Sequence, residues 1–250
     1  MPTPLSAVII TLDAADQLDA CLASVAFAQE ILVVDAGSTD GTVELARARG
    51  AKVVTHRWLG FGRQKQFAVS QAAYDWVLCL DADERVSEEL RASIVTELEA
   101  PRGFVYSMPR CNRFLGRWLR HGEGYPDWNT RLFHRAHGSW SDDPVHEHVL
   151  TTVPVLRLSG DLMHESAEAL ERYLDKQNRY TTLQAERMLA DGRKAGVTDL
   201  VFSPLVRFLK FYVFRLGFLD GVPGLVHIAI GCMNSFNKYA KLRALKRFTQ

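Results

Sequence analysis

The stretch that decides the fold is Trp76-Val77-Leu78-Cys79-Leu80-Asp81-Ala82-Asp83, an apolar run that ends in two carboxylates one residue apart. A short, continuous apolar run of this kind is typical of a strand buried on both faces of a parallel sheet. Because a bare charge is costly inside such a sheet, the carboxylates mark the point at which the strand emerges. Open α/β sheets bind ligands at this carboxyl edge, so the position of the two aspartates carries more information than the Asp-x-Asp pattern itself.

Earlier runs in the chain have the same form. Each is short, β-branched and apolar, and a helical pattern follows it. The first leads into Asp13 and the second ends at Asp35, so three acidic strand ends are expected at one edge of one sheet. The fold class predicted is α/β, a mostly parallel sheet flanked by helices. The strands expected before Trp76 are residues 7–12, 31–36 and 51–56, and a helix is expected over residues 62–73.

Composition narrows the class of protein. The chain has 250 residues, enough for a full α/β core, and a formal net charge of +1 argues against a nucleic-acid partner. That average conceals a division. Acids outnumber bases by 15 to 8 in residues 1–100, whereas residues 201–250 hold eight bases and one acid, Asp220. The cysteines are widely separated, which favours reduced thiols over a disulfide framework or a zinc site; they are Cys21, Cys79, Cys111 and Cys232.

With these elements in place, the sequence resembles the family 2 glycosyltransferases, the inverting enzymes of the GT-A fold that use nucleotide sugars. The resemblance rests on VIITLD (8–13), VVDAGSTDGT (33–42) and LDADE (80–84). Within the family the chain is most similar to the small bacterial lipopolysaccharide core β-1,4-glucosyltransferases, through RLFHR (131–135), VHEHV (145–149) and KYAKL (238–242).

The resemblance implies a domain organisation. Residues 1–190 are expected to form the GT-A domain, with a nucleotide-binding half over 1–100 and an acceptor and catalytic half over 101–190. Residues 199–250 are expected to form an amphipathic, basic helical extension, and the stretch 190–198 is the candidate linker.

At the acidic edge, the resemblance implies a divalent cation, Mg²⁺ or Mn²⁺, that offsets the charge of the diphosphate leaving group. Asp83 is the expected direct ligand, with Asp81 directed at the ribose or at a metal-bound water. His164 is a further candidate for the metal or the diphosphate, with structural packing as its alternative. The alternative for the two aspartates is that they cap the helix beginning near Ser87.

The nucleotide is expected along the same edge. By resemblance, Asp35 accepts a hydrogen bond from N3 of a uracil base, although the turn that follows it also has a complete structural explanation. Lys65 lies where relatives carry a basic residue near the nucleotide, and a solvated helix face is its alternative. Arg131 is expected to hold acceptor or diphosphate oxygens. The full nucleotide-sugar set predicted is Thr11, Leu12, Asp13, Asp35, Lys65, Asp81, Ala82, Asp83 and Arg131.

An inverting transfer needs a general base that deprotonates the acceptor hydroxyl. The densest cluster of titratable groups, residues 140–148, falls where the family places its base. Glu147 is the first choice and Asp143 the second, with His146 or His148 orienting the carboxylate or contacting phosphate. The alternative is an exposed acidic turn followed by a strand.

The basic tail predicts contact with a membrane surface. Residues 201–218 are rich in aromatic side chains with bases inserted, which makes a centred span costly and an interfacial position favourable. The apolar run 221–233 is interrupted by Pro223 and Gly224 and is too short to span, and a basic helix is expected over 237–247. The alternative is that these helices cover the catalytic domain or form a dimer contact, so a homo-oligomer is left open.

The function expected is the transfer of a hexose, glucose from UDP-glucose, to a lipid-linked saccharide of the lipopolysaccharide inner core, at the cytoplasmic face of the bacterial inner membrane. The N-terminus lacks signal-peptide character, consistent with that location. Alternatives are another nucleotide sugar with a different lipid-linked or protein acceptor, and a non-catalytic nucleotide-sugar-binding or scaffold protein. A nucleotidyltransferase is disfavoured because residues 11–16 contain no Gly, Lys or Arg to cradle phosphate.

Overall fold

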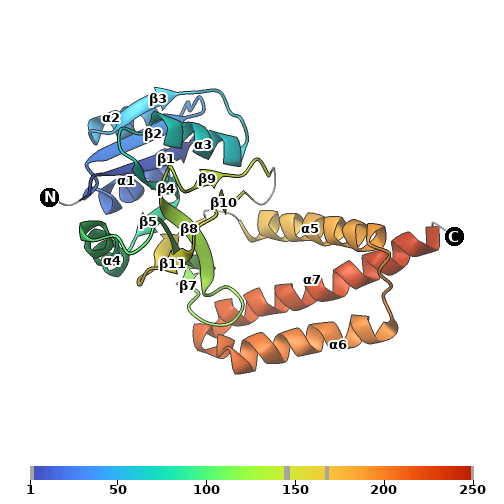
Figure 1. Cartoon of the computed structure of the whole chain (residues 1–250). Helices are drawn as coiled ribbons and strands as arrows, with labels where there is room; N and C mark the ends of the chain where they lie inside the picture. Colours follow the sequence, from blue (N-terminus) through green and yellow to red (C-terminus); the bar gives the residue numbers. More distant parts are fainter. Residues whose placement is uncertain (1–2, 144–146, 167–168, 249–250) are drawn as a thin grey trace. The chain divides into compact units, whose positions relative to one another are not determined.

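The computed structural model describes residues 3–143, 147–166 and 169–248. The chain forms two compact units, the first from Met1–Arg110 with Asp127–His164 and the second from Cys111–Pro126 with Glu165–Gln250. Figure 1 shows the chain coloured from blue at the N-terminus to red at the C-terminus. The sequence placed a boundary between residues 190 and 199, whereas in the structure helix α5 (Leu170–Ala190) packs against the last helix, α7 (Gly221–Phe248), and is grouped with it.

The first part of the sheet is parallel and confirms the expected strand arrangement. Its order is β3-β2-β1-β4. In the register, Thr11 lies opposite Asp35, and Ile10 lies opposite Asp81, so the acidic ends of three strands are level with one another. The strands are β1 (Leu5–Thr11), β2 (Glu30–Asp35), β3 (Lys52–Thr55) and β4 (Trp76–Asp81).

Beyond β4 the sheet becomes mixed. The next strands in order are β8, β6, β12 and β5, and β4 pairs antiparallel with β8, as β8 does with β6. A separate two-stranded sheet is formed by β9 and β10. The bounds are β5 (Glu84–Val86), β6 (Val105–Phe114), β8 (Asp127–His134), β9 (Ser139–Trp140), β10 (Val149–Leu150), β11 (Val155–Arg157), which pairs parallel with β6, and β12 (Leu162–His164).

Helices cover both faces of this sheet because its strands are apolar on both. On β1, Ala7 and Ile9 belong to one buried cluster, and Val8 and Ile10 belong to another. The first cluster is completed by helices α1 (Ala15–Ser24), α2 (Thr42–Ala48) and α4 (Glu88–Glu99), and the second by α3 (Phe61–Gln71). The alternation along each strand follows the period of two that any β-strand imposes.

The second unit is helical. After the short strand β7 (Arg117–Trp118) and α5 come α6 (Val197–Phe208), a π-helix (Leu209–Phe214), a 3₁₀ helix (Gly217–Asp220) and α7. The expected interruption at Pro223 and Gly224 is wrong, since α7 is continuous. Pro223 lies in its first turn, where the missing N–H has no intrahelical partner to lose.

In the described part of the chain, no helix by itself has the length and apolar character needed to cross a membrane. The pair Val197–Phe214 and Gly217–Lys246 meets those criteria only when taken together, and it is bent by 74°. The four cysteines are free, as expected; Cys21, Cys79 and Cys111 are buried and Cys232 is partly buried.

Candidate functional site

Asp35 organises the turn at the end of β2. Its Oδ1 accepts hydrogen bonds from the hydroxyls of Thr11 at 2.8 Å and Ser38 at 2.5 Å, and its Oδ2 accepts from the backbone N–H groups of Gly37 and Ser38, both at 2.9 Å. Burial opposes ionisation, but these hydrogen bonds, led by those from Ser38, hold the pKa of Asp35 below its usual value. Asp35 is 1% exposed, and both of its carboxylate oxygens accept hydrogen bonds within the turn. A bound nucleobase would have to displace one of these hydrogen-bond donors to contact Asp35.

The loop after β1 is tied to the same turn. Asp13 adopts a left-handed backbone, with φ of 46°, and its Oδ1 accepts from the N–H of Thr39 at 2.8 Å while its own N–H donates to Ser38 Oγ. Leu12 is 52% exposed beside it. An exposed apolar side chain next to a hydrogen-bonded turn offers a surface on which a planar base could pack.

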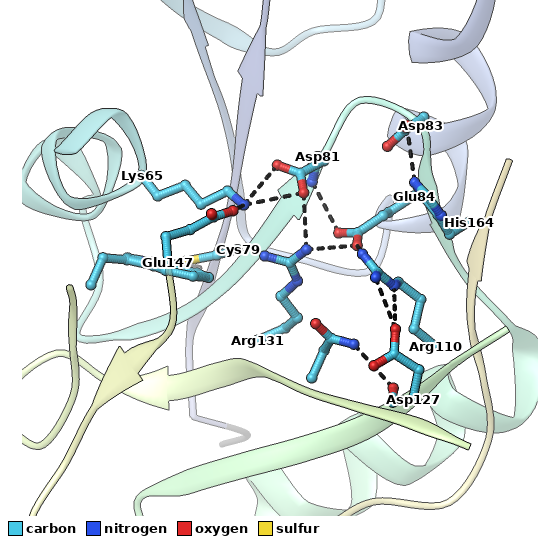
Figure 2. A network of polar contacts seen from close by, with 12 residues as sticks. Lys65, Cys79, Asp81, Asp83, Glu84, Arg110, Asp127, Arg131, Glu147 and His164 are labelled. Carbon is cyan, nitrogen blue, oxygen red and sulfur yellow. Dashed lines mark hydrogen bonds and ion pairs between the residues drawn. The ribbon is translucent and has the colours of Figure 1, made fainter. Parts of the chain in front are cut away.

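Asp81 lies at the centre of an ion-pair network (Figure 2). Lys65 Nζ is 3.0 Å from its Oδ1 and 3.1 Å from its Oδ2, and Arg131 Nη2 donates to Oδ2 at 2.9 Å. Burial opposes ionisation here, but the charges of Lys65 and Arg131 hold the pKa of Asp81 well below its usual range. Lys65 is 2% exposed, which excludes the alternative of a solvated helix face.

Two atoms of this network keep unused hydrogen-bonding capacity. Within the described residues, Asp81 Oδ1 and Arg131 Nε are buried without a hydrogen-bond partner. Lys65 is close enough to Oδ1 for an ionic interaction, but its geometry gives a hydrogen bond only to Oδ2. Since buried polar groups are rarely left unsatisfied, a spare acceptor and a spare donor at this edge fit a polar ligand.

Glu84 contacts both Asp81 and Arg131 in this network. It is fully buried; its Oε2 accepts from the N–H of Asp81 at 3.1 Å and its Oε1 accepts from Arg131 Nη2 at 2.7 Å. Arg110 Nη1 lies 3.8 Å from the same Oε1. Glu84 was not among the site residues predicted from the sequence. Its position directly after the two aspartates was the available signal.

Asp83, in the turn between β4 and β5, lies beside His164 at the end of β12. His164 Nε2 is 3.2 Å from Asp83 Oδ2, and the two side chains are 20% and 27% exposed. The alternative that the aspartates cap a helix is wrong, since Ser87 is the N-cap of α4 and accepts from the N–H of Leu90.

The described residues contain no group of three His, Cys, Asp or Glu side chains close enough to hold a metal ion. This does not conflict with a nucleotide-bound cation, since Mg²⁺ commonly takes one or two carboxylates from the protein and the remaining ligands from phosphate and water. Asp83, with His164 beside it, fits that donor set. Asp81 does so less well, because its charge is already matched by Lys65 and Arg131.

Glu147 joins the network through Lys65. Its Oε1 is 3.0 Å from Lys65 Nζ, and its side chain is 20% exposed, so one lysine bridges Glu147 and Asp81. Asp143 is exposed, and His148 is exposed with its N–H donating to Ser141 Oγ at 3.0 Å. His146 lies outside the described residues. The structure therefore brings Glu147, the first choice of base, into the network around Asp81.

The arrangement can act on an anionic ligand. The turn at Asp35 and the loop with Leu12 and Asp13 lie at the same sheet edge as Asp81, and Ala82 sits half-buried in the turn beside it. Lys65 also lies 4.8 Å from the centre of the Trp140 ring, which shields it from water. A buried cation, spare polar atoms and a partly exposed carboxylate suit binding of a charged nucleotide followed by proton transfer.

Comparisons with known proteins show the family to which the chain belongs. The Glycosyl transferase family 2 model matches residues 6–153. The lipopolysaccharide core biosynthesis glycosyltransferase LpsC of Rhizobium meliloti (strain 1021) is 31% identical, over 96% of this chain and 92% of its own length. The uncharacterized glycosyltransferase RP128 of Rickettsia prowazekii (strain Madrid E) is also 31% identical, over 88% of this chain and 80% of its own. Among solved structures, S. aureus TarS aligns over 93% of this chain and 49% of its own with a TM-score of 0.45 and 16% identity.

Proposed function

This chain belongs to glycosyl transferase family 2 and is a homologue of a lipopolysaccharide core biosynthesis glycosyltransferase, and from that premise we propose that it transfers glucose from UDP-glucose to an inner-core acceptor with inversion. The observation that carries the proposal is the bridge that Lys65 makes between Asp81 and Glu147. It joins the expected nucleotide residues to the expected base, although 66 residues separate Asp81 from Glu147 in the sequence.

The donor is proposed to lie along the edge formed by the ends of β1, β2 and β4. Leu12 and Asp13 would border the base, Thr11 would hold Asp35 in place, and the ribose would meet the spare Oδ1 of Asp81 beside Ala82. The ammonium of Lys65 and the unpartnered Nε of Arg131 would attract the diphosphate. Each of these roles uses a group that is already held in position before the ligand arrives, which lowers the cost of binding.

A divalent cation, Mg²⁺ or Mn²⁺, would be held by Asp83 with His164 beside it. When bound, such an ion supplies charge that offsets the negative charge developing on the diphosphate. The protein adds its own positive charge through Lys65 and Arg131.

Glu147 is proposed as the general base and Asp143 remains the second choice. The base removes the proton of the acceptor hydroxyl while that oxygen attacks the anomeric carbon and the bond to the diphosphate breaks. In the described structure Lys65 holds the carboxylate of Glu147 in an ion pair, which fixes the position of the proposed base beside the nucleotide residues.

The acceptor is proposed to be lipid-linked, with the protein held at the cytoplasmic membrane surface by its helical unit. Helix α6 has no buried residue, although most of its side chains are apolar. Phe214 is 78% exposed and Val222 is 70% exposed. Exposed apolar side chains beside a surplus of lysine and arginine fit the interface of an anionic leaflet.

The decisive experiment is a screen of the purified protein against several nucleotide sugars, with Mn²⁺, with Mg²⁺ and with a chelator, following release of the nucleoside diphosphate. Turnover of UDP-glucose that requires a divalent cation is the expected result. Turnover of a different nucleotide sugar would identify that sugar, and not UDP-glucose, as the donor. Binding of a nucleotide sugar without turnover, with or without acceptor extract, would favour a non-catalytic protein. The anomeric configuration of the product, determined by NMR, tests inversion.

A further inference from the structure

The helical unit contains an open groove between α6 and α7 that combines apolar and cationic side chains. It encloses about 510 Å³, and its walls include Phe202, Val206 and Phe211 together with Lys210 and Lys238. Phe202 and Val206 are 58% and 59% exposed. Apolar side chains of this size, exposed together along one groove, indicate a surface that another molecule covers.

Two lysines of this groove keep positive charge that no carboxylate of the described residues neutralises. In the part of the chain that the structure describes, neither Lys210 nor Lys238 has a carboxylate partner; each lies near an aromatic ring, Phe211 at 5.1 Å and Tyr239 at 5.1 Å respectively. Asp199, an acid on the groove wall, accepts from the N–H of Gly196 at 2.7 Å. Burial and the like charge of Arg207 lower the pKa of Lys238, and a bound anion would relieve that repulsion.

A second, polar cavity of about 130 Å³ adjoins the groove, since Arg207, Ser235 and Lys238 line both. Arg207 is fixed between them: its Nε donates to Glu123 Oε2 at 3.0 Å, and its Nη1 donates to Ser235 Oγ at 3.3 Å. Gly231 of α7 leaves the room for this pair, because a Cβ there would lie 2.3 Å from Glu123 Oε2.

The cavity is lined by groups that recognise hydroxyls. Asn234 donates to Gln177 at 2.7 Å, and the Tyr173 hydroxyl lies 3.3 Å from His227 Nε2. Tyr180 and Gln184 add a hydroxyl and an amide for which the described residues provide no hydrogen-bond partner. Side chains with amides, phenols and a fixed arginine–glutamate pair offer both donors and acceptors, as a sugar ring requires.

We propose that the groove and the cavity together bind a phosphorylated glycolipid. Its phosphate lies between Lys210 and Lys238, its acyl chains lie along Phe202, Val206 and Phe211, and its sugar enters the polar cavity. The inference rests on the proposed function in one respect, the lipid-linked acceptor, and it identifies the surface of the chain that holds such a lipid.

Vesicle binding tests the site with phosphatidylinositol, which carries a phosphate, a cyclic polyol and acyl chains. Co-sedimentation of the full chain is compared for phosphatidylcholine vesicles doped with equal fractions of phosphatidylinositol or phosphatidylglycerol, two lipids of equal charge. Binding to phosphatidylinositol should be roughly three- to tenfold tighter, the contribution of one or two additional hydrogen bonds. Equal binding to the two lipids would overturn the role of the cavity.

Three variants separate the parts of the site. Lys210→Gln with Lys238→Gln should weaken binding to both anionic vesicles roughly tenfold or more. Tyr180→Phe with Gln184→Leu should abolish only the preference for phosphatidylinositol. The matched control, Arg187→Gln with Lys194→Gln, removes two charges from exposed positions of the same unit outside the groove and should change little. An equal loss of vesicle binding in the control would show that binding depends only on the overall surface charge, and would overturn the proposal.

A second copy of the chain is the competing occupant of the groove. If Phe202→Ser with Val206→Ser converted a dimer into a monomer in analytical ultracentrifugation without weakening vesicle binding, the groove would be a dimer contact and the lipid site would be refuted. Binding of UDP, measured in every variant, should stay unchanged. If the wild-type protein bound the lipid but did not turn over UDP-glucose, the proposed function would be refuted and the lipid site would not.

Discussion

At the residue scale, a buried lysine between two carboxylates sets the electrostatics of the candidate site. Lys65 would be expensive to bury alone, and the ion pairs with Asp81 and Glu147 offset that cost. Asp81 is also paired with Arg131, whereas Asp83 lies beside His164. The chemistry of the site is therefore expected to divide between a fixed Asp81 and a ligand-binding Asp83.

Asp83→Asn should abolish turnover of the nucleotide sugar and weaken cation-dependent UDP binding, because an amide brings no negative charge to the ion. UDP titration by calorimetry with and without Mn²⁺ checks this, and Asp16→Asn, an exposed carboxylate of α1, is the control. Full activity in a folded Asp83→Asn protein would rule out Asp83 as the metal ligand.

Glu147→Gln should lower kcat by roughly 10²- to 10⁴-fold, since the amide cannot accept the acceptor's proton. Donor binding should persist, and the acidic limb of the wild-type pH–rate profile should disappear. Asp143→Asn should be mild. If Asp143→Asn were the severe variant and Glu147→Gln kept near-normal kcat, the base would be Asp143.

Asp35→Asn should affect both stability and binding. The carboxylate now accepts hydrogen bonds from N–H and O–H groups, and the NH₂ group of the amide cannot accept them. The free energy of unfolding should therefore fall by about 1–3 kcal/mol. If Asp35 also contacts the base, KM for the UDP-sugar should rise as well. Denaturant unfolding and steady-state kinetics on one preparation separate the two effects, and a stability loss with unchanged KM would leave Asp35 as a turn residue only.

At the scale of elements, one carboxylate ties helix α4 to strand β6. Glu97 near the end of α4 accepts from the Tyr106 hydroxyl at 2.8 Å and from Arg102 Nη2 at 2.6 Å. The hydrogen bond from Arg102 is the largest influence and, against the effect of burial, lowers the pKa of Glu97 to about 2. This contact fixes α4 against the sheet that carries the acidic edge.

Glu97→Gln should lower the free energy of unfolding at pH 7 by about 1–3 kcal/mol. A carboxyl whose pKa is lower in the folded state stabilises the fold above its unfolded value, here near 4.5, and that contribution disappears as the pH falls toward 2. The difference in the free energy of unfolding between wild type and variant should therefore be largest at pH 7 and should shrink between pH 4.5 and 2. Urea unfolding across that range measures it, and the exposed Glu99→Gln should show no such pH dependence.

At the scale of the whole molecule, the two units divide the chemistry between them. The first unit holds the acidic sheet edge, and the second exposes apolar side chains and carries the basic tail. The membrane attachment proposed for the second unit would use two contributions: long-range attraction from lysine and arginine, which salt screens, and apolar contact, which salt does not screen.

Phe214→Ser with Val222→Ser should weaken binding of the full chain to vesicles roughly fivefold or more, and the loss should persist at high salt. Flotation of protein with vesicles over a salt series measures this. Leu150→Ser, which removes a half-exposed apolar side chain from the first unit, is the matched control. Unchanged flotation of the double variant would contradict the proposed membrane contact.

Local patterns in the sequence were sufficient to predict the parallel strands and to predict that their acidic ends lie at the same edge of the sheet. A strand buried on both faces must be apolar throughout, so β1, β2 and β4 were recognisable one by one, and parallel connections bring their carboxyl ends to one edge. The same local logic failed at Pro223, where a proline in a first helical turn looks like a break in the sequence.

Only the tertiary structure decided which charges meet. Lys65 and Glu147 are 82 residues apart and Arg131 and Glu84 are 47 apart, and no periodicity relates them. The sequence determined that carboxylates emerge at this edge, because burying a bare charge in a sheet is costly. It left open which cation neutralises each one, since that depends on how distant strands pack together, and this packing leaves Asp83 beside His164 and Asp81 locked between Lys65 and Arg131.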